Sequence, residues 1–290
     1  MIDISVIIVS WNVSELLESC LTSLRRETGI TKEILVVENA SRDGSADMVR
    51  EKFSDVVLIV NKENRGFARA NNQGIRRARG RHILLLNPDT EVHAGTLATT
   101  VRTLDEHREI GILGCSIFGK DGVRQHSVRR DPTLSSQLLI LLKMHVFFPK
   151  LSALQRYFAV DFSYTHAEDV EQVMGAFLAF PAQLIERIGL LDEGFFLWFE
   201  EVDYCRRTRA SGLRVRFDPM ITITHAGGES FGQLLSIEQQ LLFNRSLLRY
   251  FHKQHSPLAF ALLALLTPLS ILLAALEPIV KRWYVPKPLR

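Results

Sequence analysis

The stretch Ile83-Leu84-Leu85-Leu86-Asn87-Pro88-Asp89-Thr90 joins an apolar run to a proline and a carboxylate. An apolar run of this length that ends in turn residues is typical of a buried strand. Because proline stops the strand and restricts the turn, the side chain of Asp89 has a defined direction. Ligands of open α/β sheets bind at the carboxyl ends of the strands, so Asp89 is a candidate binding residue. The alternative is a strand-to-helix turn in which Asp89 or Thr90 caps the helix.

The first 120 residues alternate between strand-like and helix-like segments. The predicted strands cover 4–9, 33–37, 56–60 and 83–86, and the predicted helices cover about 14–24, 45–53 and 66–79, the first with Ser14 as N-cap. This alternation predicts βαβ units, and therefore an α/β fold with a mainly parallel sheet and helices on both faces.

Polar residues follow each of these strands. In chain order they are Ser10 and Asn12, then Glu38 and Asn39, then several in 64–72, and finally Asp89. Because the carboxyl ends of parallel strands meet at one edge of a sheet, we expect these side chains to converge on a single crevice.

The second half of the chain is less regular. The apolar stretch at 135–148 is expected to be a helix, with a core position favoured over an interfacial one, and 173–180 is expected to be a buried strand. A helix from Glu200 through Arg209, stopped by Gly212, and a strand at 213–217 follow. Residues 225–228 are expected to form a flexible loop that carries His225.

Composition restricts the class of protein. The 290 residues are 47% apolar with a net charge of +3, which predicts a folded core and gives no indication of nucleic-acid binding. The three cysteines are too few for a disulfide framework or a zinc cluster and fit a reducing, cytoplasmic setting. The N-terminus lacks the basic region of a signal peptide, so none is expected.

An acidic cluster, Glu200-Glu201-x-Asp203, follows the aromatic residues Phe195, Phe196, Trp198 and Phe199. An apolar wall raises the pKa of a carboxyl group and suits it to general-base catalysis. The alternative is that these acids only complement the dipole of the helix they begin.

At these residues the chain resembles family 2 glycosyltransferases of the GT-A fold, especially a bacterial branch that includes rhamnosyltransferases. The matching segments, in consistent order over about residues 3–230, are 6–12, 36–45, 64–72, 86–90, 174–176, 192–203 and 225–230. The resemblance implies a Rossmann-like mixed, mainly parallel sheet flanked by helices, to which the sequence adds a hydrophobic helical tail. It divides the chain into a catalytic domain at 1–255, with a nucleotide-binding part at about 1–118 and an acceptor part at about 119–255, and a tail at 256–290.

The resemblance also implies roles for individual residues. The nucleotide-sugar would contact Ser10, Asn12, Glu38, Gly66, Arg69, Asn71, Asn87, Asp89 and Glu200. The family's metal motif corresponds to Asn87-Pro88-Asp89, so Asp89, joined by His225, would hold Mg²⁺ or Mn²⁺ while an amide replaces the first acid. Glu201 would be the catalytic base. Glu38 and Glu201 each stand where the family usually has aspartate.

The implied reaction is the inverting transfer of a sugar from a nucleoside-diphosphate sugar to an acceptor hydroxyl, in the synthesis of bacterial cell-surface polysaccharide or glycolipid. The alternatives are a catalytically inactive nucleotide-binding scaffold and a nucleotidyltransferase. A nucleotidyltransferase is expected to show a glycine-rich phosphate loop early in the chain, and residues 10–14 contain no glycine.

The tail has no charged residue from Ser256 to Leu276, and basic residues flank this run on both sides. Its length suits a membrane span, a re-entrant hairpin broken at Pro268 or a buried helix of an oligomer. A span would export the basic end, against the positive-inside tendency, so association with a membrane surface is favoured over crossing. We therefore expect a protein at the cytoplasmic side of the inner (plasma) membrane that acts on a saccharide or lipid-linked acceptor.

Overall fold

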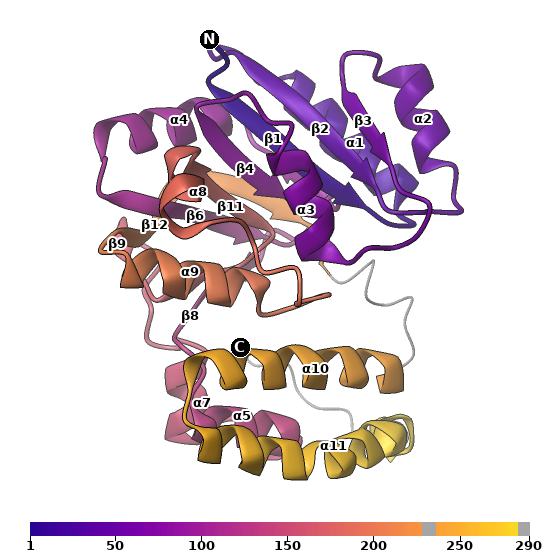
Figure 1. The fold of residues 1–290 in the computed structure, drawn as a ribbon, viewed down its shortest axis with the longest axis vertical. Coiled ribbons are helices and arrows are strands. Elements are labelled where there is room, and N and C mark those ends of the chain that lie inside the picture. Colours follow the sequence, from indigo (N-terminus) through magenta and orange to yellow (C-terminus); the bar gives the residue numbers. More distant parts are fainter. Residues whose placement is uncertain (228–235, 284–290) are drawn as a thin grey trace.

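The computed structural model describes residues 1–227 and 236–283, and within them a ten-stranded mixed sheet forms the centre of the molecule (Figure 1). Its main path runs in the order β3-β2-β1-β4-β11-β6-β12-β5. The strands of this path are β1 (Ile4–Ser10), β2 (Lys32–Glu38), β3 (Val57–Val60), β4 (His82–Leu86), β5 (Thr90–Val92), β6 (Ile110–Phe118), β11 (Phe177–Pro181) and β12 (Arg214–His225). The short strands β7 (Arg124–Gln125) and β9 (Glu168–Asp169) pair with β6 and β12, while β8 (Val128–Arg129) and β10 (Gln172–Val173) form a separate pair.

The first four main strands are parallel, as the sequence predicts. β1 lies between β2 and β4, with Ile4 opposite Lys32 on one side and His82 on the other. Antiparallel β11 then separates β4 from β6, which makes the sheet mixed. Every residue of β1 and β4 is buried, and burial on both faces explains why these strands read as unbroken apolar runs rather than alternating ones.

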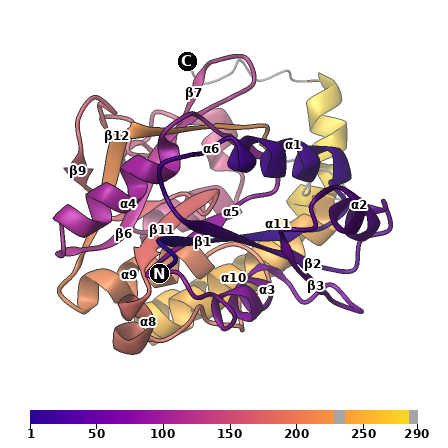
Figure 2. The same ribbon diagram turned by 90° about the horizontal axis from the view of Figure 1, so that it is seen from above.

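Helices cover both faces of the sheet (Figures 1 and 2). One face packs against α1 (Ser14–Arg25), α2 (Ser45–Lys52) and α4 (Thr96–Glu106). The other packs against α3 (Phe67–Ile75), α8 (Gln183–Ile188) and α9 (Glu200–Ala210). The remaining helices are α5 (Leu134–Leu141), α6 (Met144–Phe147), α7 (Ser152–Tyr157), α10 (Ser236–Gln254) and α11 (Pro257–Trp283).

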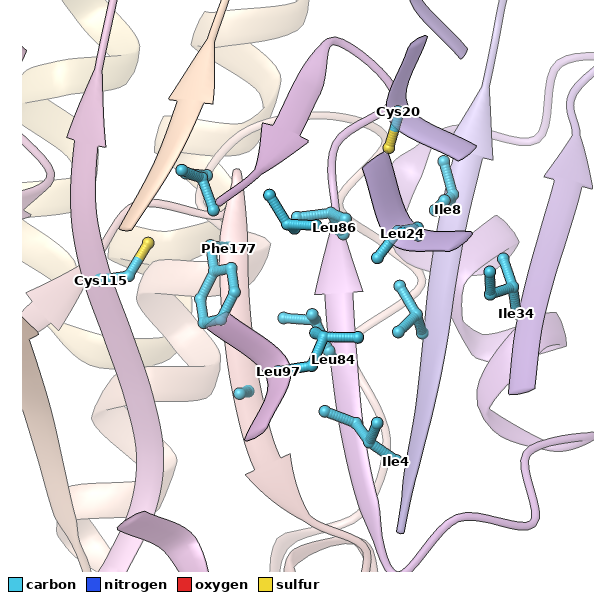
Figure 3. Packing of buried hydrophobic residues seen from close by; sticks show 14 of the residues in the cluster. Ile4, Ile8, Cys20, Leu24, Ile34, Leu84, Leu86, Leu97, Cys115 and Phe177 are labelled. Carbon is cyan, nitrogen blue, oxygen red and sulfur yellow. The ribbon is translucent and has the colours of Figure 1, made fainter. Parts of the chain in front are cut away.

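Alternate residues of the central strands contribute to different cores. Leu84 and Leu86 of β4 face the core beneath α1, together with Ile8 of β1 (Figure 3). Their neighbours Leu85 and Ile7 point the other way, into the core beneath α3 and α9. The two-residue period of a strand therefore divides one apolar run between two layers of helices.

Several local expectations are wrong. No helix follows Asp89, because Thr90 begins β5 and its hydroxyl donates to the Asn87 carbonyl at 2.7 Å, so the capping alternative fails. Ser14 is the first helical residue rather than the cap, and its N–H donates to the Asp43 carboxylate at 2.7 Å.

Three segments of the second half also differ from expectation. The stretch at 135–148 is divided between α5 and α6. The strand expected at 173–180 is interrupted between β10 and β11, at 174–176. His225 is the last residue of β12, opposite Thr90, so pairing in the sheet holds it rather than a flexible loop; Gly228 lies outside the described residues.

A helical layer lies at the end of the molecule away from the sheet, where α10 separates α11 from α9 (Figure 1). Its core includes Leu141 of α5, Tyr250 and Phe251 of α10 and Leu263 of α11, and it reaches Phe199 at the start of α9. α11 continues through Pro268 as one helix, so the re-entrant hairpin is wrong. Within the described residues, Pro257–Leu276 is the one helical segment whose length and hydropathy would allow a membrane crossing, a test that core helices of soluble proteins also pass.

The loop between α8 and α9 ties the sheet to this layer. Asp192 forms ion pairs with Arg249 and Lys253 of α10, each at 2.6 Å. Its neighbour Glu193 pairs with Arg69 and Arg76 at 3.1 and 3.0 Å, and both arginines belong to the α3 region. One short loop thus connects α3 to α10 and leads directly into the acids of α9.

We predict that Asn72→Ala destabilises the fold, because fully buried Asn72 donates to the Leu191 carbonyl at 2.9 Å and accepts from the Leu191 N–H at 3.2 Å. Buried backbone groups left without partners cost about 1–3 kcal/mol each. Chemical denaturation should show a loss of roughly 2–4 kcal/mol in the free energy of unfolding. Arg77→Ala, an exposed change beside the same helix, should stay within about 0.5 kcal/mol of wild type, and equal stability of both variants would contradict the role assigned to Asn72.

Candidate functional site

A cavity of about 360 Å³ lies where β4 ends and α9 begins. Its size is within the range of small-molecule sites. Four of the catalytic, binding and metal residues predicted from the sequence line it, namely Asn87, Glu200, Glu201 and His225. The rest of the wall includes Phe67 of α3, Arg129 of β8, Tyr157 of α7, Gln172 of β10, the 174–176 segment, Trp198 before α9 and Phe243 of α10.

Asp89 and His225 meet beside this cavity. Pairing of β5 with β12 places their backbones next to each other, and the Ala226 N–H donates to the Asp89 carbonyl at 2.9 Å. His225 Nε2 lies 3.3 Å from Asp89 Oδ1, and both side chains are nearly buried. A carboxylate and an imidazole, 136 residues apart in sequence, are thus brought to one point by strand pairing.

Gln125 of β7 orients the imidazole. Its Oε1 lies 3.0 Å from His225 Nδ1, and its Nε2 donates to the His225 carbonyl at 2.9 Å. With Oε1 as the acceptor, Nδ1 carries a proton and Nε2 is turned toward Asp89. Metal-binding histidines are commonly held this way, with an acceptor on the second ring nitrogen.

Asp89 and His225 fit a divalent cation that takes its other ligands from elsewhere. A carboxylate oxygen and an imidazole nitrogen suit Mn²⁺, and the carboxylate alone suits Mg²⁺. Within residues 1–227 and 236–283 no group of three or more potential side-chain ligands gathers at one point. Cations of this kind commonly complete their coordination with substrate phosphates and water, so two protein ligands are compatible with the site.

Glu200, which is buried, and Glu201, which is half-buried, form a pair of acids at the start of α9. The Oε2 atom of each is inaccessible to solvent and has no hydrogen-bond partner among the described residues. Burial, and then the charge of Glu201, raise the pKa of Glu200 well above its ordinary value. Burial also raises the pKa of Glu201, while the positive charge of Arg129 lowers it.

The backbone before these acids is strained. Trp198 and Phe199 have φ angles of 64° and 68°, in the left-handed region that bulky residues rarely adopt. Such conformations cost about 1–3 kcal/mol each and persist where the surroundings enforce them. Here the aromatic rings of Trp198 and Phe199 pack against Phe243 of α10, so the helical layer helps to hold the acids in place.

The residues after β1 and β2 lie at the same sheet edge but do not line the cavity. Ser10 is fully buried, and its hydroxyl has no partner among the described residues. Glu38 accepts the Ser41 N–H at 2.7 Å and the Ala40 N–H at 3.2 Å, and Asn12 accepts the Arg42 N–H at 2.8 Å. The ends of β1 and β2 therefore form a hydrogen-bonded cluster outside the cavity, and the polar strand ends do not all line the single crevice that the sequence predicts.

The residues expected in 66–71 are placed by α3. The Gly66 φ is 78°, and a Cβ there would lie 2.6 Å from the Phe196 carbonyl oxygen, so only glycine fits. Asn71 donates to the Phe67 carbonyl of its own helix at 3.0 Å, and Arg69 faces Glu193. Among the contacts that the structure describes, the side chains of Arg69 and Asn71 therefore bind other residues of the protein.

Gln125 and Arg129 are site residues that the sequence did not indicate. Both lie in two-residue strands, β7 and β8, within a segment where no pattern marked a site. Short strands carry too few residues for a detectable period, and both side chains matter only because of what the fold places opposite them.

Comparison with known proteins identifies the family and the fold of the chain. Residues 5–162, more than half of the chain, match the family model described as "Glycosyl transferase family 2". The fold is similar to that of GalNAc-T7 with UDP, GalNAc and Mn²⁺ (TM-score 0.59, 18% identity, 78% of this chain and 43% of that chain). It is also similar to that of the mannosyltransferase PcManGT from Pyrobaculum calidifontis in complex with GDP-Man and Mn²⁺ (TM-score 0.57, 20% identity, 99% and 76%). These likenesses establish the GT-A fold of the chain.

Two relatives illustrate the range of similar sequences. The low-salt glycan biosynthesis hexosyltransferase Agl10 of Haloferax volcanii is 25% identical over 219 residues, which cover 73% of this chain and 64% of that protein. The poly-β-1,6-N-acetyl-D-glucosamine synthase of Staphylococcus aureus is 22% identical over 235 residues, which cover 80% and 52%. The chain thus spans less than two thirds of the length of these curated relatives.

We predict that Glu200→Gln stabilises the fold at high pH. The raised pKa means that folded protein keeps a proton that unfolded protein has released, so Glu200 lowers stability as pH rises above the ordinary value of 4.5. Glutamine preserves the shape and removes this penalty. The melting temperature of the variant should exceed that of wild type by a few °C at pH 8, and the difference should shrink toward pH 4.

Exposed Glu186 provides a matched control on α8. Glu186→Gln should leave the melting temperature almost unchanged across the same pH range. A Glu200→Gln protein that is less stable than wild type at pH 8 would show that the carboxylate has a stabilising partner instead.

Proposed function

The chain belongs to glycosyl transferase family 2, and we propose that it moves a sugar from a nucleoside-diphosphate sugar to an acceptor hydroxyl with inversion at the anomeric carbon. The observation that supports this most is the convergence of Asp89, His225, Glu200 and Glu201 at the cavity. A pair of cation ligands on one side and a buried base on the other match the two needs of the reaction. A leaving diphosphate requires positive charge, and an attacking hydroxyl requires a proton acceptor.

In this proposal the nucleotide part of the donor lies along the β1 and β2 ends, within about residues 1–118, and the acceptor contacts residues from about 119–255. The hydroxyl of Ser10, which has no partner among the described residues, and the remaining acceptor capacity of Glu38 suit the polar edges of a nucleoside. Because Gly66 has no side chain, its backbone lies close to Phe196. The helix α3, which contains Arg69 and Asn71, begins next to this contact.

Glu201 is the proposed base. Its carboxylate takes the proton of the acceptor hydroxyl while that oxygen forms a bond to the anomeric carbon. The bond from the anomeric carbon to the diphosphate oxygen breaks on the opposite face, and its electron pair leaves with the nucleoside diphosphate. Glu200 contributes to the electrostatics of the pair, because the negative charge of Glu201 raises the pKa of Glu200.

Asp89 and His225 are the proposed ligands of a divalent cation, which when bound would supply positive charge for the departing diphosphate. Asn87 replaces a second acid at this point, so the protein contributes less negative charge. Gln125 binds the imidazole of His225 at Nδ1, which leaves Nε2 turned toward Asp89.

The finer parts of the proposal concern the biological setting. We place the chain in a rhamnosyltransferase-like branch that acts in cell-surface polysaccharide or glycolipid synthesis. Donors of this class are made in the cytoplasm, so the enzyme would work at the cytoplasmic side of the inner membrane, with the membrane surface and a saccharide or lipid-linked acceptor as partners. The apolar helix Pro257–Leu276 supports the membrane partner.

We predict that metal-dependent donor binding and catalysis by the base can be measured separately. A panel of nucleotide-sugars, screened by thermal shift with and without Mn²⁺, identifies the donor. Glu201→Gln should keep the metal-dependent shift but release nucleoside diphosphate about 10²–10⁴-fold more slowly, since it removes only the base. Asp89→Ala should lose the metal dependence of the shift itself.

Glu186→Gln serves as the control and should match wild type. Equal release from wild type, Asp89→Ala and Glu201→Gln would reject the site assignment. Binding of the donor without release in the presence of acceptor extracts would favour an inactive scaffold. Release of pyrophosphate from a nucleoside triphosphate and a sugar phosphate would favour a nucleotidyltransferase.

We also predict a pH effect of Arg129. The base must be ionised, so activity falls as pH falls through the pKa of Glu201, which burial has raised. Arg129→Gln removes the charge that lowers this pKa, so the acidic limb of kcat/KM should move to higher pH. Arg130 instead forms an ion pair with Asp161 at 2.7 Å, so Arg130→Gln should leave the acidic limb of kcat/KM in place. An unchanged profile for Arg129→Gln would dissociate Arg129 from the base.

A further inference from the structure

α11 has one face packed against the protein and one face bare. Ala259, Leu263, Ser270 and Ala274 are buried where the helix packs on α10 and α5. On the opposite side, leucines recur at spacings of three and four, and each is between 39% and 76% exposed. These residues, which we call the outer face of α11, are Leu258, Leu262, Leu265, Leu269, Leu272 and Leu276.

The outer face is unusual for a protein surface in water. It extends over 19 residues, or about 28 Å at 1.5 Å per residue, and no charged residue interrupts the run from Ser256 to Leu276. Soluble monomers rarely expose a contiguous apolar patch of more than a few hundred Å². A partner of low polarity is therefore expected to cover it.

The surroundings of the outer face indicate which partner. Figure 1 places α5 and α7 beside α11 at the same end of the molecule. The segment that contains them adds exposed Phe147, Phe148 and Leu151. Between Asp131 and Asp161 this segment has basic residues, including exposed Lys150 and Arg156, but no acid. An apolar surface with basic and no acidic neighbours is complementary to an anionic lipid surface.

The packing of α10 decides between lying on the bilayer and crossing it. Only two residues separate α10 from α11, and the two helices pack side by side. α10 carries Arg249 and Lys253, both ion-paired to Asp192 of the catalytic part. If α11 crossed the membrane with α10 attached, these charges would enter hydrocarbon, at a cost of several kcal/mol.

Crossing by α11 alone would break its contacts with α10. The Asn244 side chain donates to the Ser270 hydroxyl at 2.8 Å, and both residues are buried. Leu247, Phe251 and Leu263 share one apolar core that would be opened. Crossing therefore either places the charges of α10 in hydrocarbon or breaks the packing of α10 on α11, whereas insertion of the outer face alone does neither.

We propose that the outer face of α11 inserts into the headgroup region of an anionic phospholipid bilayer, with α11 parallel to the membrane plane and α10 above it. The proposal deepens the membrane partner of the proposed function and rests on it. The same helical layer supplies Phe243 of α10 and Tyr157 of α7 to the cavity wall. Docking therefore brings one wall of the cavity close to the lipid surface.

The first test measures binding of the full chain to sonicated vesicles of phosphatidylcholine with 30% phosphatidylglycerol by flotation. The double variant Leu265→Glu/Leu272→Glu should lose binding at least tenfold. The matched variant Met220→Glu/Val123→Glu changes two residues that are 77% and 63% exposed on other surfaces, and it should bind as wild type does. Equal binding of both double variants would overturn the proposal.

A charge variant keeps the test informative if the leucine variant folds poorly. Lys150→Gln/Arg156→Gln alters only exposed side chains and should weaken binding to the anionic vesicles by roughly five- to thirty-fold. It should have no effect on the weaker binding to pure phosphatidylcholine. Loss of the anionic preference supports the proposal, and an unchanged preference contradicts it.

The second test locates both chain ends. Single cysteines placed before Met1 and after Arg290 are labelled with a membrane-impermeant maleimide in intact and in broken spheroplasts. In-plane insertion requires that both become reactive only after breakage, because both ends stay on the inner side. Labelling of the C-terminal cysteine in intact spheroplasts would show a crossing and overturn the proposal.

The outcome is independent of the enzymatic activity. Vesicle binding needs no donor, and donor binding by thermal shift needs no vesicle, so either can fail while the other succeeds. Wild-type protein that ignores vesicles but forms a dimer, which Leu265→Glu/Leu272→Glu dissociates, would assign the outer face to a second copy of the chain and overturn the proposal.

Discussion

The contact between Gly66 and Phe196 is the constraint on which the site depends. The Phe67 N–H donates to the Phe196 carbonyl at 2.7 Å, and the space is so tight that a side chain at Gly66 would overlap the Phe196 ring. This contact fastens α3, which packs on the parallel strands, to the loop that leads into Glu200. In the same loop, Asp192 forms an ion pair with α10 and Glu193 forms one with α3. The position of α3 relative to the acids of α9 is therefore set by one short segment.

Beyond that segment, the site is maintained at the expense of stability. Two neighbouring carboxyl groups each have one oxygen that is shielded from solvent and has no hydrogen-bond partner among the described residues, and two aromatic residues before them have left-handed backbones. Elsewhere in the protein, buried acids are satisfied, as with Glu27, which accepts the Gly95 and Leu97 N–H groups at 2.9 and 2.7 Å and so begins α4. Unsatisfied buried carboxyl groups of this kind are characteristic of functional sites.

The two sides of the helical layer at the C-terminal end of the chain differ in what they contact. Its inner side completes the cavity through Phe243 and supports Trp198 and Phe199 by ring contacts. Its outer side is apolar and bare. A single apolar segment thus serves as core on one face and leaves an exposed apolar surface on the other, which we propose faces lipid, and this explains why composition alone left a span, a hairpin and a buried helix open.

The sequence by itself determined the parallel half of the sheet and the position of Asp89, because apolar runs, turn residues and their spacing are local and follow from the strand and helix periods. It also marked Glu200, Glu201 and His225 as candidates. Only the tertiary structure decided that Asp89 lies 3.3 Å from His225, that Gln125 and Arg129 belong to the same site, and that Pro268 does not break α11. The physical reason is that these outcomes depend on pairing between distant strands and on packing between helices, which leave no periodic pattern in the residues themselves.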